Sequence, residues 1–192
     1  MHSTGSRSSH KGRNMQHFIV TLDGDGQHNP VYIDPILQPL KDGTADLVIG
    51  SRFLNGDHAP SYRMLGITII NWLYNFGAKS KIADSQSGFR AFTKEVAVAC
   101  PIAEDGFQFS TEFLIKARAN GFRIVEVPIS CVYQGNGQDH SMNAIKHGLK
   151  VALATIKWRL KIEFLHQSYK IEKQNTLWEI RNQENSLRIS KK

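Results

Sequence analysis

Residues 18–28 read Phe-Ile-Val-Thr-Leu-Asp-Gly-Asp-Gly-Gln-His, an apolar run followed at once by two carboxylates and a carboxamide on alternate positions. The apolar run predicts a strand that ends at Leu22. Side chains alternate along an extended chain, so we expect Asp23, Asp25 and Gln27 to point to one side. The intervening glycines allow a phosphate to approach the backbone.

The oxygen atoms of these three side chains predict a divalent metal site. Hard oxygen donors suit Mg²⁺ or Mn²⁺, which keep several waters and bind through carboxylates together with the phosphates of a substrate. A nucleotide diphosphate is therefore the expected third partner. The alternative is a turn rich in Asp and Gly whose acids are only solvated, and an isolated Asp-x-Asp does not distinguish the two.

Further blocks follow this one along the chain. The five blocks are Val20–Pro30, Asp46-Leu-Val-Ile-Gly-Ser-Arg-Phe53, Asp84-Ser-Gln-Ser-Gly-Phe-Arg90, Gly106-Phe-Gln-Phe-Ser-Thr-Glu-Phe-Leu-Ile-Lys-Ala117 and Gly121-Phe-Arg-Ile-Val-Glu-Val-Pro-Ile129. In this order they resemble the family 2 glycosyltransferases, and most closely the dolichyl-phosphate mannose synthase-like branch, which loads a sugar onto a polyprenyl phosphate. The resemblance covers about residues 16–165.

The resemblance implies roles for the residues of the first two blocks. Asp25 and Gln27 match the positions that hold the metal, and Asp23 matches the position near the nucleotide ribose and the metal. Ser51 and Arg52 end a predicted strand at the edge where open α/β sheets bind ligands. Arg52 is implied to receive the phosphate of the acceptor, which an arginine fork fits in a bidentate manner.

Arg63 is implied to receive the same phosphate, and a solvated charge at the start of a helix is the open alternative. Asp84 is implied to lie in the catalytic pocket, and Arg90 to pair with phosphate or a neighbouring acid. A sugar hydroxyl as acceptor would make Asp84 a general base, whereas a phosphate is already ionised and needs none. The alternative for Asp84 is a loop cap that makes backbone hydrogen bonds.

Three weaker candidates accompany these residues. Glu112 is expected in the first turn of a helix, where the helix dipole favours an acid without any function. The loop Gly135-Asn136-Gly137 resembles the segment that closes over the donor site in relatives, and a flexible linker explains it equally well. His28 is interpreted as positioning the metal loop and not as a ligand.

Alternating helix and strand signals predict an α/β fold. The resemblance implies the C-terminal part of a GT-A type, Rossmann-like, mostly parallel sheet with flanking helices, and we expect a basic amphipathic helical tail after it. Strand signals cover residues 46–50 and 122–127, with a loop and strand over 84–92. Helices are expected after Pro30, over 62–76, and from near Ser110 to Gly121.

The domain organisation follows from what precedes Asp23. Only 22 residues lie upstream, whereas one βαβ unit of the expected nucleotide-binding half takes roughly 30 residues. We therefore expect a truncated or frame-shifted member of the family. Its predicted parts are a disordered or non-native leader over 1–16, a partial catalytic domain over 17–140, an amphipathic interfacial helix over 141–165 and a polar basic tail over 166–192.

Charge is distributed unevenly, because residues 141–192 carry a net +7 while residues 23–140 carry −3. Over 141–165 an apolar face and a basic face lie side by side, the pattern of an interfacial helix on anionic lipid. The alternative is a helix that packs on the domain with solvated lysines. The apolar face comprises Met142, Ile145, Leu149, Ala152, Ile156, Leu160 and Phe164, and the basic face comprises Lys146, Lys150, Lys157 and Lys161.

Other partners are less consistent with this pattern. No window approaches the ~20 apolar residues of a spanning helix, and no aromatic stacking platform accompanies the lysines, so nucleic acid is not an expected partner. Two cysteines form no disulfide framework and fit a reducing compartment.

The expected activity is a metal-dependent, inverting transfer of a hexose from a GDP- or UDP-linked sugar to a polyprenyl (dolichyl) phosphate at the cytoplasmic membrane face. Two alternatives remain open: transfer to a saccharide acceptor in polysaccharide synthesis, and an inactive membrane-associated remnant.

Overall fold

The computed structural model describes residues 17–55, 61–131 and 141–164, with only the backbone at 61–63, 141–147 and 163–164. The predicted leader, the loop at 135–137 and the tail from 166 onward lie outside the described residues. Four strands of the described chain form one sheet in the order β1-β3-β2-β4. Their bounds are β1 Phe18–Thr21, β2 Leu47–Ser51, β3 Arg90–Thr93 and β4 Ile124–Pro128.

The expectation of a mostly parallel sheet is wrong for these strands. β3 runs antiparallel to both β1 and β2, and β2 and β4 form the parallel pair. A parallel neighbour needs a crossover, usually a helix, whereas an antiparallel neighbour needs none. Strand β3 is reached from the preceding helix through a loop, and the order of helix and strand signals along the sequence does not reveal its direction.

The helices begin and end close to the predicted positions. The 3₁₀ turn before the first helix is capped by Asn29, whose side chain accepts a hydrogen bond from the N–H of Val31 at 3.0 Å. The described helical elements are η1 Pro30–Tyr32, α1 Ile33–Lys41, η2 Phe53–Asn55, α2 Ser61–Asn75, α3 Lys94–Ala99, α4 Gln108–Ala119 and α5 Ser141–Phe164.

The start of helix α4 differs from the sequence prediction, which placed Glu112 in the first turn. It begins at Gln108, so Glu112 lies beyond the first turn, and it ends before Gly121, which has φ +77° as helix-terminating glycines do. The carboxylate of Glu112 is buried and accepts from the N–H groups of Ala103 at 2.9 Å and Glu104 at 2.8 Å. Glu112 therefore holds the loop before α4 in place.

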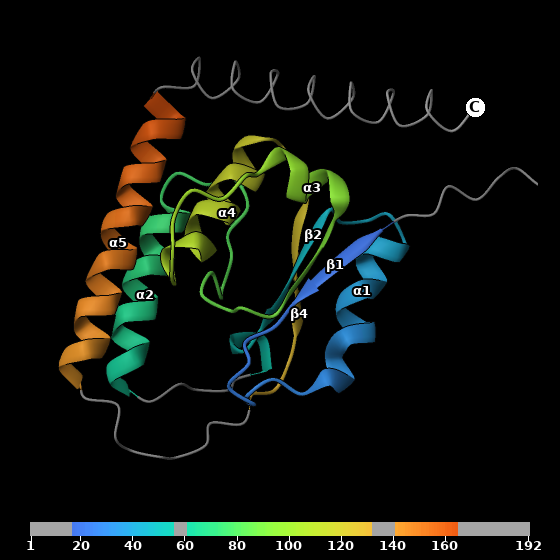
Figure 1. Ribbon diagram of the computed structural model, residues 1–192, viewed down its shortest axis with the longest axis horizontal. Coiled ribbons are helices and arrows are strands. Elements are labelled where there is room, and N and C mark those ends of the chain that lie inside the picture. The colour runs from blue at the N-terminus through green and yellow to red at the C-terminus, as the bar shows by residue number, and fades with distance from the viewer. Residues whose placement is uncertain (1–16, 56–60, 132–140, 165–192) are drawn as a thin grey trace, which may run out of the picture.

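Helices cover both faces of the sheet (Figure 1). Side chains alternate along β2, so that Leu47 and Ile49 pack with α2, α3, α4 and α5 on one face, while Val48 packs with α1 on the other. Gly50 follows in the same strand, and a Cβ built there would lie 3.0 Å from Ile36 of α1. The buried strand β2 therefore fixes the position of residue 51 and of the segment that follows it, at the carboxyl end of the strand.

Helix α5 packs on the domain through a face that its sequence pattern did not single out. Val151, Ala154, Trp158 and Ile162 are buried against α2 and α4. The predicted apolar face lies on the opposite side, where described members remain exposed and are joined by Leu153. These exposed side chains are Leu149, Leu153, Ile156 and Leu160. The predicted helix is confirmed, and it shows both the packing and an exposed apolar face.

Candidate active site

The sequence predicted a strand that ends at Leu22 and an extended chain after it, but the loop after β1 turns instead of staying extended. β1 ends at Thr21, residues 24 and 25 form a turn, and Gly26 adopts φ +74°. The N–H of Gln27 donates to the Asp25 carboxylate at 3.0 Å, which closes the turn locally. Regular alternation of Asp23, Asp25 and Gln27 along an extended strand is therefore wrong.

His28 holds the first acid of this loop. Its Nε2 donates to the Asp23 carboxylate at 3.3 Å, and its ring is buried against Phe89 with a centroid separation of 5.4 Å. This hydrogen bond lowers the pKa of Asp23 below its usual value, and partial burial of the carboxyl opposes the shift. The positioning role predicted for His28 agrees with this geometry.

Gly88 brings the third sequence block against Asp23. A Cβ built on Gly88 would lie 2.2 Å from Oδ1 of Asp23 and 2.5 Å from its Cγ, so any larger residue here would displace the carboxylate from this position. The charges of Arg52 and Arg90 also contribute to lowering the pKa of Asp23. The loop after β1 and the segment before β3 therefore form one site.

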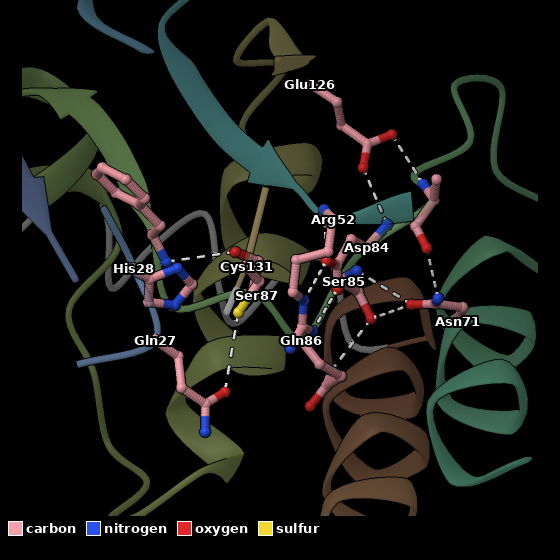
Figure 2. Close-up of polar contacts among 12 residues, drawn as sticks. Gln27, His28, Arg52, Asn71, Asp84, Ser85, Gln86, Ser87, Glu126 and Cys131 are labelled. Atoms are coloured by element: carbon pink, nitrogen blue, oxygen red, sulfur yellow. Dashed lines mark hydrogen bonds and ion pairs between the residues drawn. The ribbon is translucent and has the colours of Figure 1, made fainter. Parts of the chain in front are cut away.

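The oxygen donors of the loop fit a hydrated divalent cation only in part. Asp23 and Asp25 are exposed, and carboxylates open to water suit Mg²⁺ or Mn²⁺ that keep several waters. The side-chain oxygen of Gln27 is engaged by the thiol of Cys131 at 3.8 Å (Figure 2). Among the described residues no group of three His, Cys, Asp or Glu side chains gathers to hold a metal.

Arg52 and Asp84 form a bidentate ion pair. Nε of Arg52 lies 2.7 Å from Oδ2 and Nη2 lies 2.8 Å from Oδ1, and the backbone N–H of Arg52 adds a third hydrogen bond to Oδ2 at 3.1 Å. Asp84 is fully buried, and the Arg52 side chain is 13% exposed. The predicted acceptor arginine is thus held by the predicted pocket acid, at the end of β2.

Two further residues of the site were missed by the sequence reasoning. Glu126 of β4 accepts hydrogen bonds from the N–H groups of Ala83 and Asp84, and Asn71 of α2 contacts Ala83 and Ser85 (Figure 2). Glu126 stands between two valines in a strand otherwise composed of apolar residues, and this isolated acid was the signal that could have identified it.

One interpretation paired Arg90 with a neighbouring acid, but its hydrogen bonds to the described residues go to carbonyl and hydroxyl oxygens. Its buried guanidinium donates to the carbonyl oxygens of Ser85, Ser87 and Ser110, each at 2.9 Å, and to the hydroxyl of Ser110. Burial lowers the pKa of Arg90 to about 10. The contacts show that Arg90 ties the Asp84 segment to α4.

The remaining candidates are placed as follows. Ser51 is fully buried at the end of β2, and its hydroxyl has no hydrogen-bond partner among the residues that the structure describes. Arg63 belongs to the first turn of α2, and its side chain lies outside the described residues. Ser51 therefore faces the protein interior, and its predicted contact with a substrate stays a prediction.

Comparison with known proteins adds to this geometry. Residues 9–98 match the model of Glycosyl transferase family 2, a range that includes Asp23, Arg52, Asp84 and Arg90. The chain is similar to the dolichol-phosphate mannosyltransferase of Pyrococcus furiosus, with 30% identity over 155 residues, which cover 76% of this chain and 42% of the relative.

A second relative carries a different sugar in its name. The UDP-N-acetylglucosamine–dolichyl-phosphate N-acetylglucosaminyltransferase of Methanococcus voltae is 33% identical over 122 residues, which cover 59% of this chain and 47% of the relative. The chain spans about half the length of the curated relatives it matches.

A solved structure agrees with the fold. The glucosyl-3-phosphoglycerate synthase of Mycobacterium tuberculosis superposes with a TM-score of 0.54 at 16% identity, covering 72% of this chain and 49% of the synthase. The fold is therefore α/β of the GT-A type. The family model spans the loops that meet at Gly88, and the mannosyltransferase is 30% identical over 76% of this chain, so this chain carries a glycosyl transferase family 2 domain.

Proposed function

We propose that the protein transfers a hexose from a nucleotide sugar to a polyprenyl phosphate, with inversion, at a membrane surface. One observation carries the proposal: the exposed carboxylate of Asp23, after β1, lies against Gly88, in the segment whose Asp84 holds Arg52 by two side-chain hydrogen bonds. This arrangement supports a site in which acids of the loop after β1 would face a metal-bound diphosphate and Arg52 would face a second phosphate.

The donor is assigned to the loop after β1. Asp23 and Asp25, with Gln27 once its side chain leaves Cys131, would hold Mg²⁺ or Mn²⁺ beside the diphosphate of the donor. When bound, such a cation neutralises the charge that builds on the departing diphosphate. His28 keeps Asp23 ionised and oriented, because its hydrogen bond favours the charged carboxylate.

The acceptor phosphate is assigned to Arg52, with Arg63 as a second candidate. A phosphate oxygen forms a bond to the anomeric carbon while the bond from that carbon to the leaving diphosphate oxygen breaks, so the configuration inverts. A phosphate acceptor is already ionised, and Asp84 therefore has no proton to remove. In this proposal Asp84 orients Arg52.

The exposed side of the two long helices supports a lipid acceptor over a saccharide. α2 and α5 pack against each other (Figure 1), and each presents apolar side chains at helical spacing to solvent. Lys150, Lys157 and Lys161 flank the α5 face, a combination that suits anionic lipid. The exposed set, called the outer helix face below, comprises Leu65, Ile69, Trp72, Phe76, Leu149, Leu153, Ile156 and Leu160.

A peripheral mode of membrane contact is proposed on this basis, at the cytoplasmic side. None of the described helices has the length and hydropathy of a membrane span.

The test is a transfer assay with the full 192-residue chain. Radiolabelled GDP-mannose, UDP-glucose and UDP-N-acetylglucosamine would each be offered with Mn²⁺ and vesicles that contain dolichyl phosphate. We expect label from one donor to enter the lipid fraction, with no transfer to dolichol that lacks the phosphate. Asp25→Asn should reduce the rate by about a hundredfold, since removing one charge-stabilising group costs on the order of 3 kcal/mol.

Label that enters a soluble saccharide and not the lipid would contradict the acceptor assignment. A chain that binds none of the three donors in the presence of Mn²⁺ would favour the inactive remnant, and the proposal would then fail at its first step.

A further inference from the structure

The segment that carries Asp84 is fixed from two sides by other elements (Figure 2). From β4, the two carboxylate oxygens of Glu126 accept from the N–H of Ala83 at 2.8 Å and the N–H of Asp84 at 2.9 Å. From α2, Asn71 donates to the carbonyl oxygen of Ala83 at 2.6 Å and accepts from the N–H of Ser85 at 3.0 Å. Main-chain groups of three successive residues are therefore fixed by side chains.

These contacts determine where the Asp84 carboxylate points. Asp84 is fully buried, and both of its oxygens are used by Arg52. A bidentate pair fixes the plane of the guanidinium as well as its position. The orientation set by Glu126 and Asn71 therefore passes through Asp84 to Arg52.

The chemistry of Glu126 argues for a specific role. Glu126 is half-buried on the face of β4 opposite to Val125 and Val127, the face on which Ile124 packs against the core, and an acid there needs hydrogen bonds to offset the loss of water. Hydrogen bonds to an ionised acceptor are about twice as strong as neutral ones. A carboxylate that accepts two adjacent N–H groups is therefore a firm anchor for a loop that is otherwise irregular.

We propose that Glu126 and Asn71 are positioning residues for the acceptor phosphate, acting through Asp84 on Arg52. This inference rests on the proposed function, because Arg52 must bind the phosphate for its orientation to matter. It adds two residues to the site, from β4 and α2, that do not themselves touch the substrate.

Asp46 provides a matched control at the opposite end of the same strands. Its carboxylate accepts from the backbone N–H of Arg123 at 2.8 Å and pairs with the Arg123 guanidinium at 2.8 Å, so it also joins the β2 and β4 segments. It precedes β2, whereas Arg52 follows it. Asp46→Asn removes a comparable structural contact without touching the Asp84 segment.

The experiment measures binding of farnesyl phosphate, a short soluble polyprenyl monophosphate, to the full chain by calorimetry. We expect Glu126→Gln and Asn71→Ala each to weaken binding by about tenfold, because each variant removes or weakens hydrogen bonds that hold the Asp84 segment. Asp46→Asn should change the affinity less than twofold, even if it lowers the melting temperature of the protein as much as the other two variants do. Binding of a nucleotide diphosphate with Mn²⁺ should be unchanged in all three variants.

Wild-type affinity in both Glu126→Gln and Asn71→Ala would overturn the positioning role and leave the proposed function standing. Equal weakening by Asp46→Asn would also overturn it, because the effect would then be general destabilisation. A wild-type chain that does not bind farnesyl phosphate would contradict the acceptor assignment itself, and the inference with it. If Glu126→Gln does not fold, Asn71→Ala decides, since alanine preserves helix α2.

Discussion

Arg90 shows how a charged side chain can serve structure inside a site. Its guanidinium is buried and satisfied by three carbonyl oxygens and a hydroxyl, from residues 85, 87 and 110. The cost of burial is visible in its pKa, which is lowered to about 10. Arg90 remains protonated near neutral pH, because that pKa still lies well above 7.

Arg90→Lys is therefore expected to destabilise the fold. A single ammonium does not reproduce the planar fork that reaches three carbonyls, and buried acceptors left unpaired cost about 1–3 kcal/mol each. We expect a loss of about 3 kcal/mol in the free energy of unfolding, measured by urea titration. A loss below about 0.5 kcal/mol would show that the carbonyl contacts contribute little.

Gly88→Ala tests the contact between two loops with little effect on the core. The new Cβ would meet the carboxylate of Asp23, which is the mobile end of a side chain and can move away. We expect the melting temperature to change little while Mn²⁺-dependent nucleotide binding falls at least tenfold. Gly66→Ala is the control, because a Cβ there meets nothing within 4 Å.

The pH dependence at Asp23 follows from its hydrogen bond to His28. The folded pKa of Asp23 lies below the usual value of an aspartate, so the hydrogen bond contributes stability above that usual value, and the contribution is lost as the pH falls through the folded pKa. His28→Phe should raise the pKa of Asp23, measured by carboxyl ¹³C NMR titration. An unchanged titration would show that His28 does not stabilise the carboxylate.

Sequence reasoning identified most of the charged residues at this scale but not their partners. Asp23, Arg52 and Asp84 were recognisable by residue type and by family resemblance, whereas the pairing of Arg52 with Asp84 joins positions 32 residues apart. Arg90 was expected to pair with phosphate or a neighbouring acid, and its backbone acceptors were not foreseen, because they carry no sequence signal. Such long-range contacts depend on the tertiary fold.

Among the elements, α5 combines a packed face with an exposed one. Trp158 is 4% exposed, its indole N–H donates to Glu104 at 3.0 Å, and Lys116 and Lys161 lie over its ring. Trp158→Ala should cost about 3–5 kcal/mol of unfolding free energy, as buried aromatic truncations do. Urea titration would measure it beside Leu153→Ala, an exposed position expected to change stability by less than about 0.5 kcal/mol.

Equal losses from Trp158→Ala and Leu153→Ala would contradict the assignment of the packed face.

The helix itself was predicted well from its 3.6-residue periodicity. Which of its two apolar faces meets the core was not, because both Leu153 and Trp158 are apolar and only the neighbouring helices decide. The direction of β3 escaped prediction for a similar reason, since strand pairing is a property of the sheet.

In the whole molecule, the outer helix face and the site meet in α2. Asn71 points to the Asp84 segment, whereas the adjacent Trp72 is 62% exposed. One helix therefore joins the proposed lipid contact to the positioning of Arg52. A polyprenyl phosphate held in a bilayer would present its phosphate close to the helix that supports the site.

Vesicle binding tests this arrangement directly. We expect the full chain to co-sediment with vesicles rich in phosphatidylglycerol and to bind phosphatidylcholine vesicles less, with Trp72 fluorescence shifted to the blue. Trp72→Ser and Leu153→Ser should each weaken binding about tenfold or more, because burial of such a side chain contributes about 1.5–3 kcal/mol. Ile102→Ser, at an exposed apolar position outside the two helices, is the control.

The same assay distinguishes the contribution of the lysines to vesicle binding from that of the apolar side chains. Lys150→Glu should weaken binding to the anionic vesicles more than to the neutral ones, since each lysine near such a surface contributes about 1 kcal/mol, and added salt should reduce the difference. If Trp72→Ser, Leu153→Ser and Ile102→Ser bind alike, the outer helix face does not contact lipid, and a soluble acceptor becomes the better match to the site. If only salt and Lys150→Glu have an effect, the contact is electrostatic and the apolar side chains remain in water.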